Sequence, residues 1–124
     1  MNIKKAFQQY MEAHDFKPTY IGGAPNEPAA CWWIIGGGGN NISKNSTGEK
    51  QKNYILSVYY RDIIAETVDE QIQTLEELMN SKQCIDIDGY DIIETEATVF
   101  PTDQDIDNQE RTIGLIQITL TVYT

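Results

Sequence analysis

The sequence predicts an α+β domain in which a largely antiparallel sheet of four to five strands carries two helices on one face. The first observation is the alternation of apolar and polar residues over 113–124, which is typical of a strand with one dry and one wet face. The second is that two other segments place apolar residues at helical spacing. The third is the order helix, strand, strand, helix, strand, strand, in which the strands follow one another as hairpin-like pairs. A chain of 124 residues fits a single domain, 1–124.

The first half of the chain predicts one helix and one strand. Residues 20–28 are rich in Gly and Pro and indicate a loop. The apolar run 30–35 predicts a central strand, which Gly36 to Gly39 are expected to end. A mobile loop rich in Gly, Asn and Lys is expected over about 36–52, as the tip of a hairpin. The helix is predicted within residues 1–14 by a stripe of Ile3, Phe7, Tyr10, Met11 and His14.

The middle of the chain predicts a second strand and a second helix. Residues 53–61 are apolar on both faces, which favours a central strand. Thr67 and Glu70 are spaced as a capping box, which predicts that the helix begins there. Asn80 and Ser81 are expected to end it. Its apolar stripe consists of Val68, Ile72, Leu75 and Met79.

The last third of the chain predicts two longer strands after a turn at Asp88-Gly89, with a short strand over 84–88 before that turn. Residues 90–100 alternate in polarity, and Pro101 is expected to close their strand. An acidic loop is expected over about 101–111. The terminal strand then follows, and we expect it to be exposed.

No group of residues meets the requirements of catalysis or cofactor binding, so we expect neither. The glycine run lacks the Gly-Lys-Ser/Thr and the helix start of a phosphate-binding loop. Cys31 has only His14 as a conceivable base and no activating sequence context. Glu94 and Glu96 would stand about 7 Å apart on one strand face, but such alternation usually marks a solvent-facing surface.

Asp103, Asp105 and Asp107 have the spacing of the first three ligands of a calcium-binding loop. The sixth position would be Asn108 in place of glycine, and the twelfth would be Gly114 in place of the bidentate glutamate. We therefore expect no metal centre here, with a weak calcium site as the remaining alternative.

Charge is divided unevenly along the chain, whose net charge is −10. Residues 1–52 hold six Lys against four acids, and residues 53–124 hold three basic residues against fifteen acids. The acidic half would repel a phosphate backbone, so we expect no direct contact with nucleic acid. No stretch of about 18 apolar residues is present, and we expect no membrane partner.

The chain resembles the tail-terminator and minor capsid (head-tail joining) proteins of tailed phages and prophages. The resemblance rests on the amphipathic N-terminal helix, on 53–61 leading into the helix 67–80, and on an acidic loop with Asp105 and Arg111 before the alternating terminal strand. It implies a non-enzymatic subunit of a homo-oligomeric ring, commonly a hexamer, that caps the tail tube and joins it to the head connector. It also implies assembly in the cytoplasm of a bacterial host and a final place in the virion.

If the resemblance holds, we expect assembly contacts from the glycine-rich and acidic loops and from the wet face of the last strand. The alternative function is a small acidic protein-binding or regulatory domain that acts as a monomer or dimer. The expected contact residues are Gly36, Gly37, Gly38, Gly39, Asn40, Asp103, Asp105, Asp107, Gln117, Thr119 and Thr121.

Overall fold

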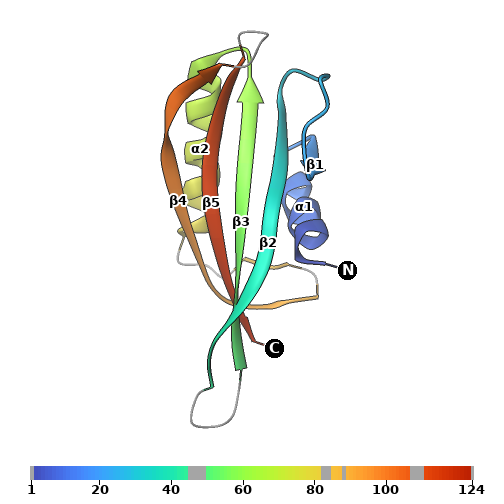
Figure 1. Cartoon of the computed structure of the whole chain (residues 1–124), viewed down its shortest axis with the longest axis vertical. Coiled ribbons are helices and arrows are strands. Elements are labelled where there is room, and N and C mark those ends of the chain that lie inside the picture. The colour runs from blue at the N-terminus through green and yellow to red at the C-terminus, as the bar shows by residue number, and fades with distance from the viewer. Residues whose placement is uncertain (1, 45–49, 82–84, 88, 107–110, 124) are drawn as a thin grey trace.

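The protein forms one five-stranded sheet with two helices behind it (Figure 1). The computed structural model describes residues 2–44, 50–81, 85–87, 89–106 and 111–123, with the backbone alone over 39–44, at 50 and over 101–106. The sheet has the strand order β1-β2-β3-β5-β4, and only the pair of β1 and β2 is parallel. The elements are α1 (Ile3–Ala13), β1 (Thr19–Ile21), β2 (Cys31–Lys44), β3 (Lys50–Asp62), α2 (Ala65–Met79), β4 (Asp91–Ile106) and β5 (Thr112–Tyr123).

Both helices pack on the same face of the sheet, as the sequence predicts. Helix α1 lies against β1 and β2, and α2 lies against β3, β4 and β5. The described core is one cluster, built by the inward residues of the strands and the apolar stripes of the helices. The fold class is therefore confirmed as α+β with a largely antiparallel sheet. No helix of the described residues lies on the opposite face of the sheet, which is turned to the viewer in Figure 1.

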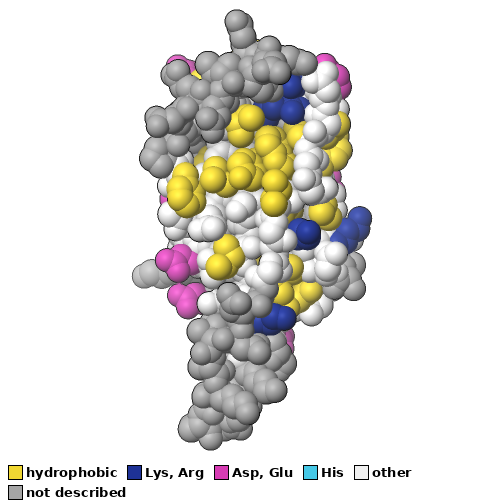
Figure 2. Space-filling model, viewed as in Figure 1, with side chains coloured by type: hydrophobic (Ala, Val, Ile, Leu, Met, Phe, Trp, Pro, Cys, Tyr) yellow, Lys and Arg dark blue, Asp and Glu magenta, His cyan; other side chains and the backbone are white. Residues whose placement is uncertain are grey.

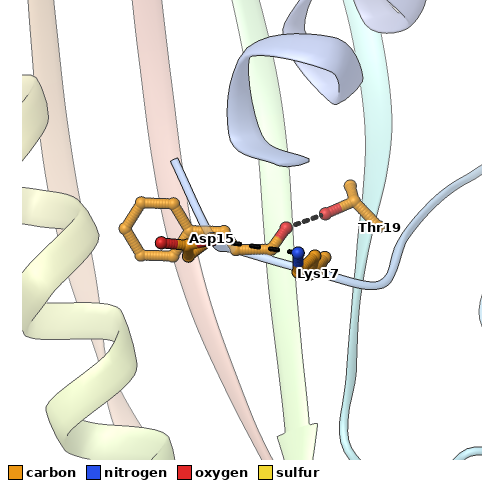
Figure 3. A network of polar contacts seen from close by, with 4 residues as sticks. Asp15, Lys17 and Thr19 are labelled. Atoms are coloured by element: carbon orange, nitrogen blue, oxygen red, sulfur yellow. Dashed lines mark hydrogen bonds and ion pairs between the residues drawn. The ribbon is translucent and has the colours of Figure 1, made fainter. Parts of the chain in front are cut away.

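The turn after α1 sets the position of the first strand. Helix α1 begins where the side chain of Asn2 accepts a hydrogen bond of 2.8 Å from the backbone N–H of Lys5. After the helix, the buried Thr19 hydroxyl donates to the carbonyl of Phe16 at 2.6 Å (Figure 3). The ion pair of Asp15 and Lys17 beside it is 3.8 Å long and exposed, so it contributes little to stability.

Two predicted loops are in part strands. The glycine run does not end the strand predicted over 30–35, because β2 continues through Gly36–Gly39 to Lys44. The next strand, β3, begins at Lys50. Likewise Pro101 does not close β4, which continues to Ile106 after a shift of register between Phe100 and Asp105. In both places the ladder of hydrogen bonds absorbs an irregularity, which is how strands pass residues that fit poorly into a regular ladder.

The predicted loop over 20–28 also proves wrong at its start, because Tyr20 and Ile21 belong to β1. Three residues are too few to produce a recognisable pattern. This strand forms because parallel pairing with Trp32 to Ile34 satisfies its backbone groups.

The capping box at Thr67 is wrong as well, because α2 begins at Ala65 with Ile64 as its N-cap and no side-chain cap. The first helical N–H groups to be satisfied, those of Thr67 and Val68, donate to the carbonyl of Ile64, and the carboxylate of Asp62 holds the turn before the helix by accepting the N–H groups of Ile63 at 2.7 Å and Ile64 at 3.4 Å. The predicted stripe of four apolar residues in α2 is fully buried, and Asn80 caps the helix end as expected.

The terminal strand has the predicted alternation but not the predicted exposure. Residues 112–122 of β5 alternate buried and half-buried without exception. However, β5 lies between β3 and β4 and does not form an edge. Its outward side chains therefore lie in the middle of the open face, where both neighbouring strands flank them.

Candidate assembly surface

One face of the sheet has no helix packed on it among the residues that the structure describes. Its composition follows from register, because side chains that point outward on paired residues stand next to one another across the sheet. On β3, Val58 and Tyr60 are buried toward the helices, so Tyr59 points outward. Its partners are Trp33 on β2 and Leu115 on β5, and Leu115 in turn pairs with Phe100 on β4.

These four side chains, together with Ile35, form a continuous apolar band across β2, β3, β5 and β4, which we call the apolar band. Figure 2 shows hydrophobic side chains crossing the open face in this way. Phe100 is 40% exposed and Ile35 is 42% exposed. The rings of Trp33 and Tyr59 stack, with centroids 5.2 Å apart and planes within 7°. Exposed apolar surface that spans several strands usually marks an interaction site.

The rest of the open face is mainly polar, as the sequence predicts for β5, with Ile55 on β3 as an exposed apolar residue opposite Thr119. Gln117 pairs with Ser57 and Thr98, and Thr119 pairs with Glu96 on β4. Thr121 donates a hydrogen bond of 2.7 Å from its hydroxyl to the side-chain oxygen of Asn53. The predicted contact residues Gln117, Thr119 and Thr121 thus lie half-buried beside the apolar band. Their role in contacts stays a prediction.

On the side of the apolar band away from Ser57 and Gln117, two buried arginines hold the segment before β2 against the sheet. Arg61 donates to the carbonyl oxygens of Pro25 at 2.7 Å, Pro28 at 2.9 Å and Ala29 at 2.9 Å. Arg111 donates to the carbonyl oxygen of Asn26 at 2.8 Å. The guanidinium carbon of Arg61 also stands 5.8 Å from the centroid of the Trp33 ring. One end of the open face is therefore closed by the chain itself.

The residues weighed for catalysis are not brought together. Cys31 is fully buried, and burial raises the pKa of its thiol, although the positive charges of Arg61 and Arg111 lower it in part. A buried thiol with a raised pKa is a poor nucleophile. His14 is exposed at the end of α1, where its ring Nδ1 is 2.9 Å from the carbonyl oxygen of Tyr10. Glu94 and Glu96 are exposed, as expected for a solvent-facing strand surface.

The glycine run takes part in a bulge of β2. Gly36 and Gly37 both have φ of +94°, and the register with β3 shifts between Gly36 and Gly38. Gly39 and Asn40 continue the ladder opposite Tyr54 and Asn53. Gly37 lies against the start of α1, where a Cβ atom would stand 3.1 Å from Cγ of Lys4 and 3.2 Å from Cγ2 of Ile3.

The acidic triplet lies at the limit of what the structure describes. The backbones of Asp103 and Asp105 belong to β4, whereas Asp107 lies outside the described residues. Within the described part of the chain, no three His, Cys, Asp or Glu side chains gather as metal ligands. The expectation of no metal centre at this triplet, with a weak calcium site as its alternative, therefore stays a prediction. No helix among the described residues is long and apolar enough to cross a membrane.

The apolar band is the feature that sequence reasoning missed. Three of its residues, Trp33, Ile35 and Tyr59, were visible in the sequence as apolar side chains on the second face of the strands at 30–35 and 53–61. That pattern was interpreted as burial on both sides of a central strand. The strands are central, but only one face of their sheet is covered.

Comparison with known proteins gives a family and a fold. A family model described as bacteriophage tail terminator protein matches residues 6–124. No curated protein matches the chain. Among solved structures, a chain of the virion of a native gene transfer agent particle superposes with a TM-score of 0.65. That superposition covers 99% of this chain and 96% of the other at 7% identity, so it shows a shared fold.

Proposed function

This chain belongs to the bacteriophage tail terminator protein family and is a structural protein of the virion, and we propose that it forms the ring that caps the tail tube and joins it to the head connector. The ring is a homo-oligomer, with six copies as the expected number, and it assembles in the host cytoplasm. The role is non-enzymatic. The partners are the tail-tube and head-connector proteins.

The observation that carries this proposal is the apolar band. A subunit that acted alone would leave Phe100 and Ile35 in water at 40% and 42% exposure, beside the stacked Trp33 and Tyr59. Because full burial of such a side chain from water is worth roughly 1.5–3 kcal/mol, covering the exposed two fifths of Phe100 or Ile35 would stabilise an association by about 0.6–1.2 kcal/mol each. We therefore assign the band to the contact between subunits, with the polar half of the open face at its rim.

Native mass spectrometry over a wide range of protein concentration tests the proposal. We expect the wild-type chain to form a closed oligomer, either alone or on tail tubes built from the tube protein of the same genome. Ile35→Gln should shift the population to monomers. Its matched control is Ile21→Gln, because Ile21 is also a strand isoleucine, is 36% exposed, and lies on β1 outside the band. A chain that stays monomeric even with tail tubes would overturn the proposal.

Salt dependence separates this function from the alternative of an acidic domain that binds a basic partner. Subunits with a net charge of −10 repel one another, and salt screens that repulsion while leaving the burial of apolar surface intact. Ring formation should therefore become more favourable as the NaCl concentration rises from about 50 mM to 500 mM. Attraction between an acidic domain and a basic partner would weaken over the same range.

A further inference from the structure

The turn between β3 and α2 presents the two most exposed large apolar side chains of the described chain. Ile63 is 65% exposed and Ile64 is 59% exposed. They are consecutive and precede the first residue of α2, so they project from one end of the molecule. We call them the isoleucine pair. Neither belongs to the apolar band, and neither joins the core cluster.

The isoleucine pair is held in place by its neighbours. The carboxylate of Asp62 accepts the backbone N–H groups of Ile63 and Ile64, at 2.7 Å and 3.4 Å. The same carboxylate accepts the hydroxyl of the buried Tyr60 at 2.8 Å. The turn is thereby tied to the core, and ordering it in a contact would cost little conformational entropy. A tied and projecting apolar pair has the properties of an interface anchor.

We propose that the isoleucine pair of one subunit docks on the apolar band of a second copy of this chain. The inference rests on the proposed function, because it names the contact that would build the ring. A head-to-tail contact joins two different surfaces of the same chain and generates a ring when the rotation closes. A band-to-band contact would instead leave all the isoleucine pairs in water.

Charge around the two surfaces supports this choice of occupant. The isoleucine pair is flanked by Asp62 and by the exposed Glu66 in the first turn of α2. The apolar band is flanked by the buried Arg61, whose guanidinium group donates to backbone carbonyls and lies near the Trp33 ring. Docking would bring these carboxylates toward the buried positive charge of Arg61, without a direct ion pair. The acids of the open face, Glu94 and Glu96, lie on the far side of the row of Ser57 and Gln117.

The first experiment measures self-association of the double variant Ile63→Ser/Ile64→Ser by native mass spectrometry and sedimentation. We expect its concentration for half-assembly to rise at least tenfold, while its melting temperature stays within a few degrees of the wild type because both side chains are exposed. Ile21→Ser is the matched control, since Ile21 is a strand isoleucine that is 36% exposed on β1 and lies in neither surface. It should assemble as the wild type does.

The second experiment traps the contact by disulfide formation. Subunits with both Ile64→Cys and Ile35→Cys should become linked in series, giving covalent chains of three or more copies under oxidation. Subunits with Ile35→Cys alone should give no covalent oligomer, and the wild type reports on the native thiols. Covalent dimers from Ile35→Cys alone would instead identify a band-to-band contact and overturn the inference.

The outcomes separate the inference from the function on which it rests. If Ile35→Gln prevents assembly but the serine double variant assembles normally, the ring and its band survive and the isoleucine pair is not the occupant. If neither change affects assembly, the assignment of the band fails as well. If both prevent it and the paired cysteines link subunits in series, the head-to-tail contact is established.

Discussion

Gly114 lies on the inward face of β5 directly beneath α2, where the chain has no room for a side chain. A Cβ atom added at this position would stand 2.8 Å from Cγ1 of Val68 and 3.0 Å from Cγ1 of Ile72. Carbon atoms pack best at about 3.5–4.0 Å, so α2 would have to move away from the sheet by several tenths of an ångström. We predict that Gly114→Ala lowers the free energy of unfolding by about 1–3 kcal/mol, the usual cost of overpacking a core.

The assay is urea denaturation, with Gly38→Ala as control because nothing lies within 4 Å of a Cβ at that position. Val68→Ala should by itself cost roughly 2 kcal/mol by leaving a cavity. In the double variant the new methyl group enters the space that Val68 vacates, so the combined loss should fall short of the sum by about 1 kcal/mol or more. A neutral Gly114→Ala, or strictly additive losses, would refute the contact between β5 and α2.

Three further changes test the bulge at Gly37, the hydrogen bonds by which Arg61 holds the segment before β2, and the burial of Tyr10 in the core. Gly37→Ala should cost about 1–3 kcal/mol in urea denaturation, since φ is +94° there and a Cβ would stand 3.1 Å from Cγ of Lys4; an unchanged midpoint would contradict the bulge. Arg61→Lys should cost about 1–3 kcal/mol and speed amide exchange in the segment before β2, because an ammonium group cannot reach all three carbonyls. Burial raises the pKa of Tyr10 to about 12, whereas the unfolded chain ionises near 10, so stability should fall as pH rises from about 10 to 12. At pH 11 this loss is about 1.4 kcal/mol, and Tyr10→Phe should remove that part of the pH dependence in denaturation at pH 8–11.

Periodicity predicted the parts of the fold whose side chains face a single environment. The stripe from Val68 to Met79 and the alternation from Ile116 to Val122 are each buried on one side, so a local pattern carries the information. The start of α2 was misplaced because two local signals compete. Thr67 offers a capping box, but the turn that Asp62 holds after β3 already sets the chain for a helix from Ala65, so Thr67 lies inside the first turn.

Glycine and proline misled the prediction of where strands end. Both are frequent in loops, yet Gly36 and Gly37 supply the positive φ that a bulge needs, and the ladder with β3 resumes at Gly38. Pro101 lies on β4, the last strand of the sheet, where a missing N–H can point away from the ladder. Whether a glycine ends a strand or bends it depends on the partner strand, which a local pattern does not contain.

The candidate site was predictable only by half, because its two halves depend on different information. Thr119 and Thr121 follow from alternation within one strand. The apolar band requires the register between strands, since Trp33, Leu115 and Phe100 come from three segments that are far apart in the sequence. An apolar residue on the second face of a strand looks the same whether a helix covers that face in the same chain or another subunit covers it later.

The acidity of the chain and the apolar band are connected through solubility before assembly. A free subunit exposes Phe100, Ile35 and the isoleucine pair, which would favour indiscriminate association if the surface were neutral. A net charge of −10 makes every random encounter between two subunits repulsive. In the proposed ring, the burial of these apolar side chains would have to offset that repulsion. The same charge that keeps free subunits apart would then disfavour every contact that buries less apolar surface, which is how repulsion can add specificity to an interface.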